Sequence, residues 1–442
     1  MKKATGFVFL FLSSLLNAQQ SKPELIAEYM QAQENINNFS GVVLVAKGNK
    51  VLLQKSFGIA NRASATANTP DTKFRIYSIT KQFTATCILK LAEEGKLNLQ
   101  DNLSKFFPEF PNGDHITIHM LLTHTSGLKR DFLEPSEGPY KYLDYIGREI
   151  RHDELLTLIE KRHPDTKPGK KLSYSNLGFS LLGLIVEKAS GMSYSDYLSR
   201  TIFIPLHMTN SGVCEKKQTY PNMAIGYNPV DPEHLNPSTM NMDFLFGCGN
   251  IYSTVEDLNK WDKSFYTNTI LQEQSKKKMY GPYMEGTGYG VHVDSLFHQS
   301  CSALNGSAFG FNASLSSFPK DSVCIIVLSN NESPAGRINY SLAGIIFDIA
   351  VTKPYRHTPV PLDAKSWKKY AGDYGAVKIK KRKGHLYLNN AEQSVLCAES
   401  STRFYLTDKM DWTIEFMLDK DGHVSSLISS IGGISETHTK IN

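Results

Sequence analysis

The sequence has little excess of one charge, no internal repeat, no low-complexity tract and no apolar run long enough to cross a bilayer. Lysine and arginine total 48 against 43 aspartate and glutamate residues. So small a basic excess does not indicate a nucleic-acid partner, and we interpret the one basic cluster, at residues 378–383, as a solvated strand edge. A membrane helix needs roughly 20 apolar residues, and no stretch reaches that length. We therefore expect neither a nucleic-acid partner nor a membrane-spanning helix.

Cysteine is also scarce, with six residues in a chain of 442. An even number would allow disulfides in an exported protein, but Cys87 lies in a helical pattern and Cys324 lies inside the apolar run 323–328. Both are therefore expected in the core. Because 41% of the residues are hydrophobic, the chain can bury a large core without cross-links, and we expect no disulfide.

The N-terminus has the layout of a cleavable signal peptide. Lys2 and Lys3 precede a short apolar stretch, residues 6–16, and Ala18 follows it. We expect cleavage after Ala18 and a mature protein that is periplasmic or secreted. No cysteine follows the cut directly, so a lipid anchor is not expected, and no transmembrane helix is expected after cleavage.

The patterning beyond the leader predicts a mixed α/β (α+β) fold. Two β-branched runs, 39–45 and 51–57, are separated by Lys47-Gly48-Asn49-Lys50, which is a hairpin signal. From about residue 80 to 199 the pattern is mostly helical, with clear helices at 155–161 and 177–189, and Gly191 ends the second. Strand signals return at 291–293, 313–318 and 323–328, before a helical run at 338–351. This order predicts an antiparallel sheet built from both ends of one domain, flanked by helices, with an inserted all-helical subdomain.

Prolines at positions 354, 359 and 361 punctuate a short polar link, after which the pattern alternates as in antiparallel strands. The predicted organisation is a signal peptide (1–18), a hydrolase-like domain (19–352), a Pro-containing linker (353–364) and a small C-terminal antiparallel β module (365–442).

Ser78 and Lys81 are the candidate catalytic pair. A serine hydroxyl is a poor nucleophile until a neighbour takes its proton, and a lysine three residues on lies on the same face of a helix. Ser-x-x-Lys also begins at four other serines, so the tetrad alone is weak. Ser78 is distinguished by its setting: Thr72 and Ser78 offer N-cap chemistry, and a helical apolar pattern then runs to Gly95. At a helix start the N–H of Ser78 is suited to hold an oxyanion.

A second candidate group lies at Tyr174-Ser175-Asn176, where an extended segment opens the helix at 177. Tyr174 could share the base role with Lys81. Asn176 could hold Lys81 and a substrate amide.

At this point the sequence resembles the serine β-lactamase and penicillin-binding-protein-like family, in the branch with class C β-lactamases, D-alanyl-D-alanine carboxypeptidases and related esterases. The resemblance covers residues 39–348. Besides the Ser78 tetrad and the Tyr174 triplet, it includes these segments in order: Gly95-Lys96-Leu97, Leu121-Leu122-Thr123-His124-Thr125-Ser126-Gly127-Leu128, Pro168-Gly169, Gly249-Asn250-Ile251-Tyr252-Ser253-Thr254, Gly310-Phe311 and Val327-Leu328-Ser329-Asn330.

The resemblance also implies a His or Lys, any residue, then Gly, on the strand that forms the far wall of the site. Counting back from Gly310 aligns this element with Leu304-Asn305-Gly306, so the glycine is present and the basic residue is leucine. Gly306 would let a substrate approach the strand, and Ser307 would supply the second oxyanion donor. The leucine puts recognition of β-lactams and D-Ala-D-Ala in doubt.

These observations predict a secreted serine hydrolase acting by acyl transfer through a Ser78 acyl-enzyme on an ester, an amide or a cell-wall peptide. No metal or organic cofactor is expected. His115 and His119 are four residues apart, but no third ligand at a convincing spacing supports a metal site, and His124 is expected to tie a turn. Two alternatives stay open: a catalytically weak penicillin-binding-like protein that binds peptide or cell-wall fragments without turnover, and a functional role for the β module as a lid or adaptor.

Overall fold

The structure is a computed structural model that describes residues 20–131, 149–214, 220–227, 241–331, 333–362, 366–389, 391, 394–406 and 409–441. The expected signal peptide at residues 1–18 lies outside this part of the chain. None of the helices in the described residues is long and apolar enough to cross a membrane. All six cysteines are free thiols, and Cys87 and Cys324 are buried as expected.

The first part of the chain folds around a six-stranded antiparallel sheet with strand order β2-β1-β11-β10-β9-β8. Its strands are β1 (Gly41–Lys47), β2 (Lys50–Phe57), β8 (His292–Leu296), β9 (Gln299–Ala308), β10 (Phe311–Phe318) and β11 (Val323–Ser329). Strand β1 pairs with both β2 and β11, so the beginning and the end of this domain meet in one sheet. The predicted hairpin and the predicted joining of the two ends are confirmed.

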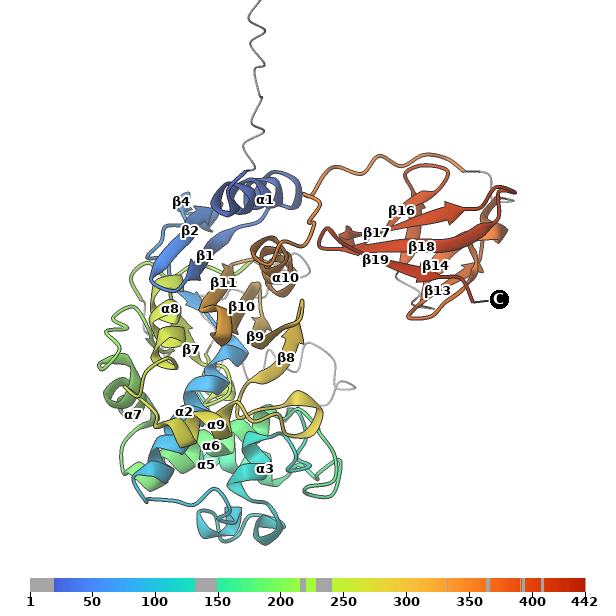
Figure 1. Cartoon of the computed structure of the whole chain (residues 1–442). Coiled ribbons are helices and arrows are strands. Elements are labelled where there is room, and N and C mark those ends of the chain that lie inside the picture. Colours follow the sequence, from blue (N-terminus) through green and yellow to red (C-terminus); the bar gives the residue numbers. More distant parts are fainter. Residues whose placement is uncertain are drawn as a thin grey trace, which may run out of the picture.

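Both faces of the sheet are covered, so every residue of β11 and every residue of β1 except Lys47 is buried. In β1, Val42 and Leu44 face the large core shared with the helical part of the chain. Val43 and Val45 face a second core that includes α1 (Lys22–Asn37) and α10 (Ala335–Ile346). In Figure 1, α1 and α10 lie on one side of the sheet and α8 (Val255–Ser264) lies on the other. The sheet is therefore the middle of three layers.

The helical part follows β2 in sequence and holds the residues predicted to be catalytic. Its helices are α2 (Thr80–Glu93), α3 (Ile118–Leu122), α5 (His152–Glu160), α6 (Asn176–Ser190), α7 (Tyr194–Leu198) and α9 (Glu273–Met279). Helix α6 begins after Ser175, whose hydroxyl accepts from the N–H of Gly178, and ends at Gly191, which has a φ of 70°. Its capping explains why this helix could be predicted from the sequence.

The helices at the two ends of this domain go beyond or differ from the prediction. The predicted elements begin at residue 39, and α1 precedes them, with a capping box in which Glu24 accepts from the N–H and the hydroxyl of Ser21. The last helix of the domain, expected to reach residue 351, ends at Ile346. Asp348 then adopts a φ of 60°, which turns the chain out of the helix.

The C-terminal strands form a separate eight-stranded antiparallel sheet in sequence order, from β12 to β19. Their bounds are β12 (Gly372–Tyr374), β13 (Val377–Arg382), β14 (His385–Leu388), β15 (Val395–Ala398), β16 (Arg403–Leu406), β17 (Lys409–Leu418), β18 (Val424–Ile431) and β19 (Ile434–Thr439). The N–H of Ile441 donates to the carbonyl of Asp373, which brings the two ends of the sheet together. The sheet encloses its own core, which includes Tyr370, Phe404 and Phe416.

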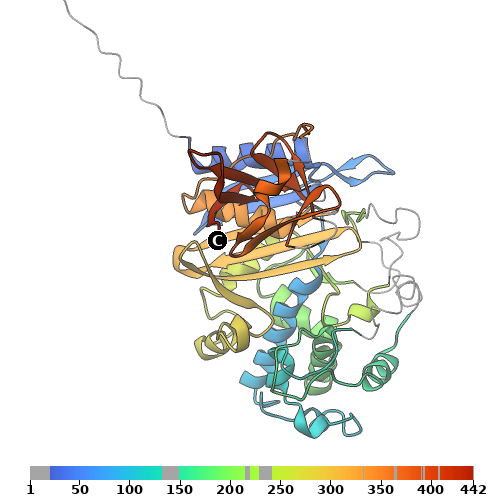
Figure 2. The same cartoon turned by 90° about the vertical axis from the view of Figure 1, so that its right-hand side faces the viewer.

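This β module contacts the first domain through α10. Arg337 forms an ion pair with Asp411, and the hydroxyl of Ser341 donates to the carbonyl of Gly432 over 2.6 Å. Figure 1 shows the module as a separate body beside the six-stranded sheet, and Figure 2 views the molecule from the side of that body. The contacts fix the module against the outer layer of the first domain, away from α2.

Candidate active site

Ser78 lies on a 3-10 turn, η1 (Tyr77–Ile79), that leads directly into α2. The prediction that Ser78 marks a helix start is confirmed, but the reason given for it is wrong. Neither η1 nor α2 has a side-chain N-cap, and the hydroxyl of Thr72 accepts from the N–H of Thr69 instead. The Ser78 hydroxyl does not cap the helix, so it is available to contact other side chains.

The residue before Ser78 is strained. Tyr77 has a φ of 43°, in the left-handed region that a bulky side chain rarely adopts. Such a conformation costs on the order of 1–3 kcal/mol and persists only where surrounding structure holds it. The side chain of Tyr77 is buried, with its ring 6.3 Å from that of Phe311 on β10. Packing against the sheet thus presents Ser78 at the start of α2.

Lys81 lies one turn along, enclosed in the protein with only 1% of its surface exposed. Its Nζ donates to Ser78 Oγ over 3.1 Å and to the carbonyl of Cys248 over 2.9 Å. The same nitrogen lies 4.9 Å from the ring centroid of Tyr174 and 5.7 Å from that of Phe179. Its partners here are a hydroxyl, a carbonyl and two aromatic rings, all uncharged.

Tyr174 reaches the same hydroxyl from the other side. Its phenol oxygen lies 2.8 Å from Ser78 Oγ, so Ser78 contacts two proton-handling groups at once. The structure therefore brings together the three residues that the sequence analysis named as catalytic, from positions 78, 81 and 174.

His124 packs against the ring of Tyr174. The two rings lie 4.5 Å apart, and His124 Nδ1 accepts from the N–H of Ser175 while its carbonyl accepts from the N–H of Ser173. The prediction that His124 ties a turn is confirmed. Burial, with a smaller contribution from the charge of Lys81, lowers the pKa of His124 to about 3. The imidazole is therefore neutral at physiological pH.

Asn176 is the first residue of α6, and its side chain points toward a residue that the sequence analysis missed. Its Nδ2 donates to Asp131 Oδ1 over 2.7 Å, whereas the sequence analysis expected Asn176 to hold Lys81. Its N–H donates to the carbonyl of Arg130 over 2.8 Å. Arg130 and Asp131 follow the family segment that ends at Leu128, but no sequence pattern signals their contact with Asn176.

Gly306 lies on β9, directly behind the Ser78 turn. A Cβ at this position would lie 2.1 Å from the carbonyl oxygen of Ile76 and 3.0 Å from the backbone nitrogen of Ser78. The glycine was expected to let a substrate approach the strand, but the segment that approaches Gly306 here is the backbone of η1 and Ile76. A glycine is required at position 306 because these two main-chain segments touch.

Leu304 and Ser307 lie on the same strand with opposite orientations. Leu304 shares the face of Gly306 and packs, partly buried, against the large core. Ser307 is exposed and pairs with Asn312 of β10. Its role as the second oxyanion donor stays a prediction.

The histidines considered for metal binding have other partners. His119 Nδ1 lies 2.8 Å from the hydroxyl of Tyr289, and His115 lies 3.6 Å from a carboxylate oxygen of Asp114.

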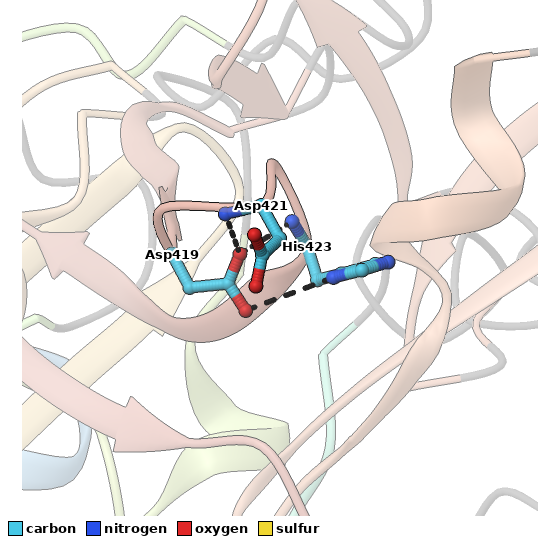
Figure 3. Close-up of side chains that lie close together, drawn as sticks. All are labelled: Asp419, Asp421 and His423. Atoms are coloured by element: carbon cyan, nitrogen blue, oxygen red, sulfur yellow. Dashed lines mark hydrogen bonds and ion pairs between the residues drawn. The ribbon is translucent and has the colours of Figure 1, made fainter.

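One group of possible metal ligands is found elsewhere, at Asp419, Asp421 and His423 in the turn between β17 and β18 (Figure 3). All three residues are exposed. Asp419 Oδ1 accepts from the N–H of Asp421 over 3.0 Å and from that of His423 over 2.8 Å. This carboxylate closes the turn, and we assign the group to hairpin formation.

Comparisons with known proteins show which family the chain resembles. A family model described as Beta-lactamase matches residues 24–343. The chain is 32% identical over 305 residues to the putative penicillin-binding protein PbpX of Bacillus subtilis (strain 168). That alignment covers 68% of this chain and 73% of PbpX. The chain is 26% identical over 454 residues to penicillin-binding protein 4* of the same organism, covering 95% and 99%. The crystal structure of the D-amino acid amidase from Ochrobactrum anthropi SV3 shares the fold, with a TM-score of 0.64, 21% identity and coverage of 74% and 99%.

Proposed function

This chain belongs to the β-lactamase family, as its motifs predict, and on that premise we propose that it is a serine hydrolase working through an acyl-enzyme on Ser78. One observation carries the proposal: Ser78 Oγ lies 2.8 Å from the Tyr174 hydroxyl and 3.1 Å from Lys81 Nζ. A hydroxyl placed between two proton-handling groups is what an activated nucleophile needs.

In the acylation step, Ser78 Oγ attacks the carbonyl carbon of an ester or amide. Its proton passes to the Tyr174–Lys81 pair, and the same pair protonates the departing alcohol or amine as the bond to the acyl carbon breaks. The N–H groups of Ser78 and Ser307 would hold the negative oxygen that develops. Asn176, oriented by Asp131, would position the substrate beside Tyr174.

In the deacylation step, water takes the place of the leaving group. The Tyr174–Lys81 pair removes a proton from the water, the new oxygen–carbon bond forms, and the ester bond to Ser78 breaks with return of the proton to Oγ. Transfer to an amine instead of water would make the protein a transpeptidase. Among the ester, amide and peptide substrates that this mechanism allows, the D-amino acid amidase that shares the fold favours an amide for this chain.

We further propose that the protein acts in the periplasm or outside the cell. This proposal rests on the basic start, the apolar stretch at 6–16 and Ala18.

A second candidate function is binding of peptide or cell-wall fragments without turnover. It is favoured by Leu304, which places an apolar, partly buried side chain where the family resemblance implies a basic one. Hydrolysis separates the two functions. We expect the wild-type protein to release p-nitrophenol from p-nitrophenyl acetate, or p-nitroaniline from D-phenylalanine p-nitroanilide, at rates that Ser78→Ala abolishes. Equal rates in both proteins would favour binding alone.

A further inference from the structure

One charged side chain, that of Arg130, lies over the ring of Tyr174 and faces solvent. The Arg130 guanidinium carbon lies 5.3 Å from the centroid of the Tyr174 ring, and 73% of the Arg130 side chain is exposed. The hydroxyl of the same ring contacts Ser78. A positive charge and the Ser78 hydroxyl therefore contact the same side chain.

The backbone holds Arg130 in this place. Its carbonyl accepts from the N–H of Asn176, which is the first residue of α6. Its Nε lies 3.4 Å from Asp131 Oδ2, and the other oxygen of Asp131 accepts from the amide of Asn176. The three residues form one network beside Tyr174. Asp131 thus orients Arg130 and Asn176, because each of its carboxylate oxygens faces one of them.

The loop that leads into Tyr174 is basic as well. Backbone hydrogen bonds join this loop to the segment before Arg130: Ser173 donates to His124, Gly169 to Thr125 and Asp165 to Gly127. The loop carries three exposed lysines, at positions 167, 170 and 171. A Cβ on Gly127 would lie 2.1 Å from a carbonyl oxygen of the loop, so the glycine permits the close approach. Lys167 and Lys170 line a separate cavity with Asn112 and His115, so Arg130 is the cation that lies over the Tyr174 ring on its exposed side.

We propose that Arg130 binds a carboxylate of the substrate and so selects anionic substrates for the reaction at Ser78. The inference rests on the proposed function. A guanidinium presents a planar fork of N–H donors that matches a carboxylate with two parallel hydrogen bonds. The ion pair with Asp131 engages Nε and leaves most of the side chain exposed.

The opposite wall explains why this charge has to come from the Tyr174 side. Leu304 is apolar and packs against the core, and the same face of β9 at Gly306 is closed by the Ile76–Ser78 backbone. Strand β9 thus presents no cationic side chain at the position where the family resemblance implies one. Arg130 supplies a charge at the Tyr174 ring instead.

The test compares charged and neutral esters that are otherwise matched. Mono-p-nitrophenyl glutarate carries a carboxylate in the acyl half, and 3-acetoxybenzoate carries one in the leaving half; the methyl ester of each is the neutral control. We expect Arg130→Gln to lower kcat/KM about tenfold for at least one of the two anionic esters and less than twofold for the neutral ones. Arg130→Lys should retain part of this preference, because it keeps the charge without the fork.

Lys167→Gln is the matched control, since it removes one exposed positive charge from a separate cavity lined by Asn112 and His115 and should change all four values less than twofold. Equal losses on charged and neutral esters, or an equal effect of Lys167→Gln, would overturn the role of Arg130. Binding of the anionic esters to Ser78→Ala protein, with and without Arg130→Gln, is measured by calorimetry. An affinity that Arg130→Gln weakens tenfold supports the inference, and an unchanged affinity contradicts it. This binding result does not depend on turnover, whereas an absence of hydrolysis by the wild-type protein refutes the proposed function.

Discussion

The Tyr174→Phe substitution isolates the proton-handling role of Tyr174 from its packing. It removes only the hydroxyl that lies 2.8 Å from Ser78 Oγ and leaves the ring against His124 and Arg130. General acid–base groups contribute about 10²- to 10⁴-fold to rate, equivalent to about 3–5 kcal/mol of the barrier. We expect the rate of acylation, measured as the p-nitrophenol burst in stopped flow, to fall by at least a hundredfold.

The folded state should tolerate this change. Ser78 Oγ keeps its contact with Lys81 Nζ at 3.1 Å, so no buried group is orphaned, and the loss of one hydrogen bond costs about 1 kcal/mol. Tyr355→Phe is a matched control, because it removes a hydroxyl that donates over 2.8 Å to Glu399, outside the catalytic group. A Tyr174→Phe protein that acylates within threefold of wild type would refute the reasoning.

Two further predictions concern the residues that hold the site in place. Gly306→Ala should destabilise the fold by about 1–3 kcal/mol and slow acylation, because its Cβ would lie 2.1 Å from the oxygen of Ile76; thermal unfolding checks this, and Gly178→Ala, whose Cβ meets nothing nearer than 3.6 Å, should do neither. An unchanged Tm for Gly306→Ala would contradict the close contact. Burial lowers the pKa of His124 to about 3, so below about pH 6.5 the unfolded chain binds a proton that the folded protein does not, and stability is lost as the pH falls from 6.5 toward 3. His124→Gln should remove about 3 kcal/mol of this loss between pH 7 and 4.5, as measured by urea unfolding, and a pH dependence equal to that of wild type would argue against a neutral buried ring.

Much of the fold could be predicted because local signals agree with the tertiary structure. The β1–β2 hairpin has its turn residues between two β-branched runs, and α6 has both caps in the sequence. Helix α1 also carries local signals, a capping box at Ser21 and Glu24 and buried residues at helical spacing, namely Ile26, Tyr29 and Met30. It could therefore have been predicted from the sequence as well.

The proposed catalytic group could be predicted for a different reason. Ser78 lies on the turn that leads into the helix of Lys81, so their spacing implies their contact, whereas the place of Tyr174 was expected only from the order of motifs in a family. Its 2.8 Å contact with Ser78 depends on how α6 packs against α2, which a single sequence does not encode locally.

The remaining site residues depend on contacts between segments far apart in the chain. The carboxylate of Asp131 accepts a hydrogen bond from the amide of Asn176, 45 positions away, where a contact between Asn176 and Lys81 was expected. Gly306 touches the Ile76 carbonyl across the domain, and Tyr77 holds a left-handed backbone because the sheet packs on its ring. No spacing rule predicts these meetings, because each is decided by the tertiary packing of the whole domain.

Intact-mass spectrometry after exposure to a fluorophosphonate tests the central claim most directly. We predict one adduct per chain within minutes, carried by the peptide that contains Ser78, with no adduct on Ser78→Ala protein and slow labelling of Lys81→Met protein. Wild-type protein that stays unlabelled, or that carries the label on another residue, would contradict a nucleophile activated by Lys81 and Tyr174.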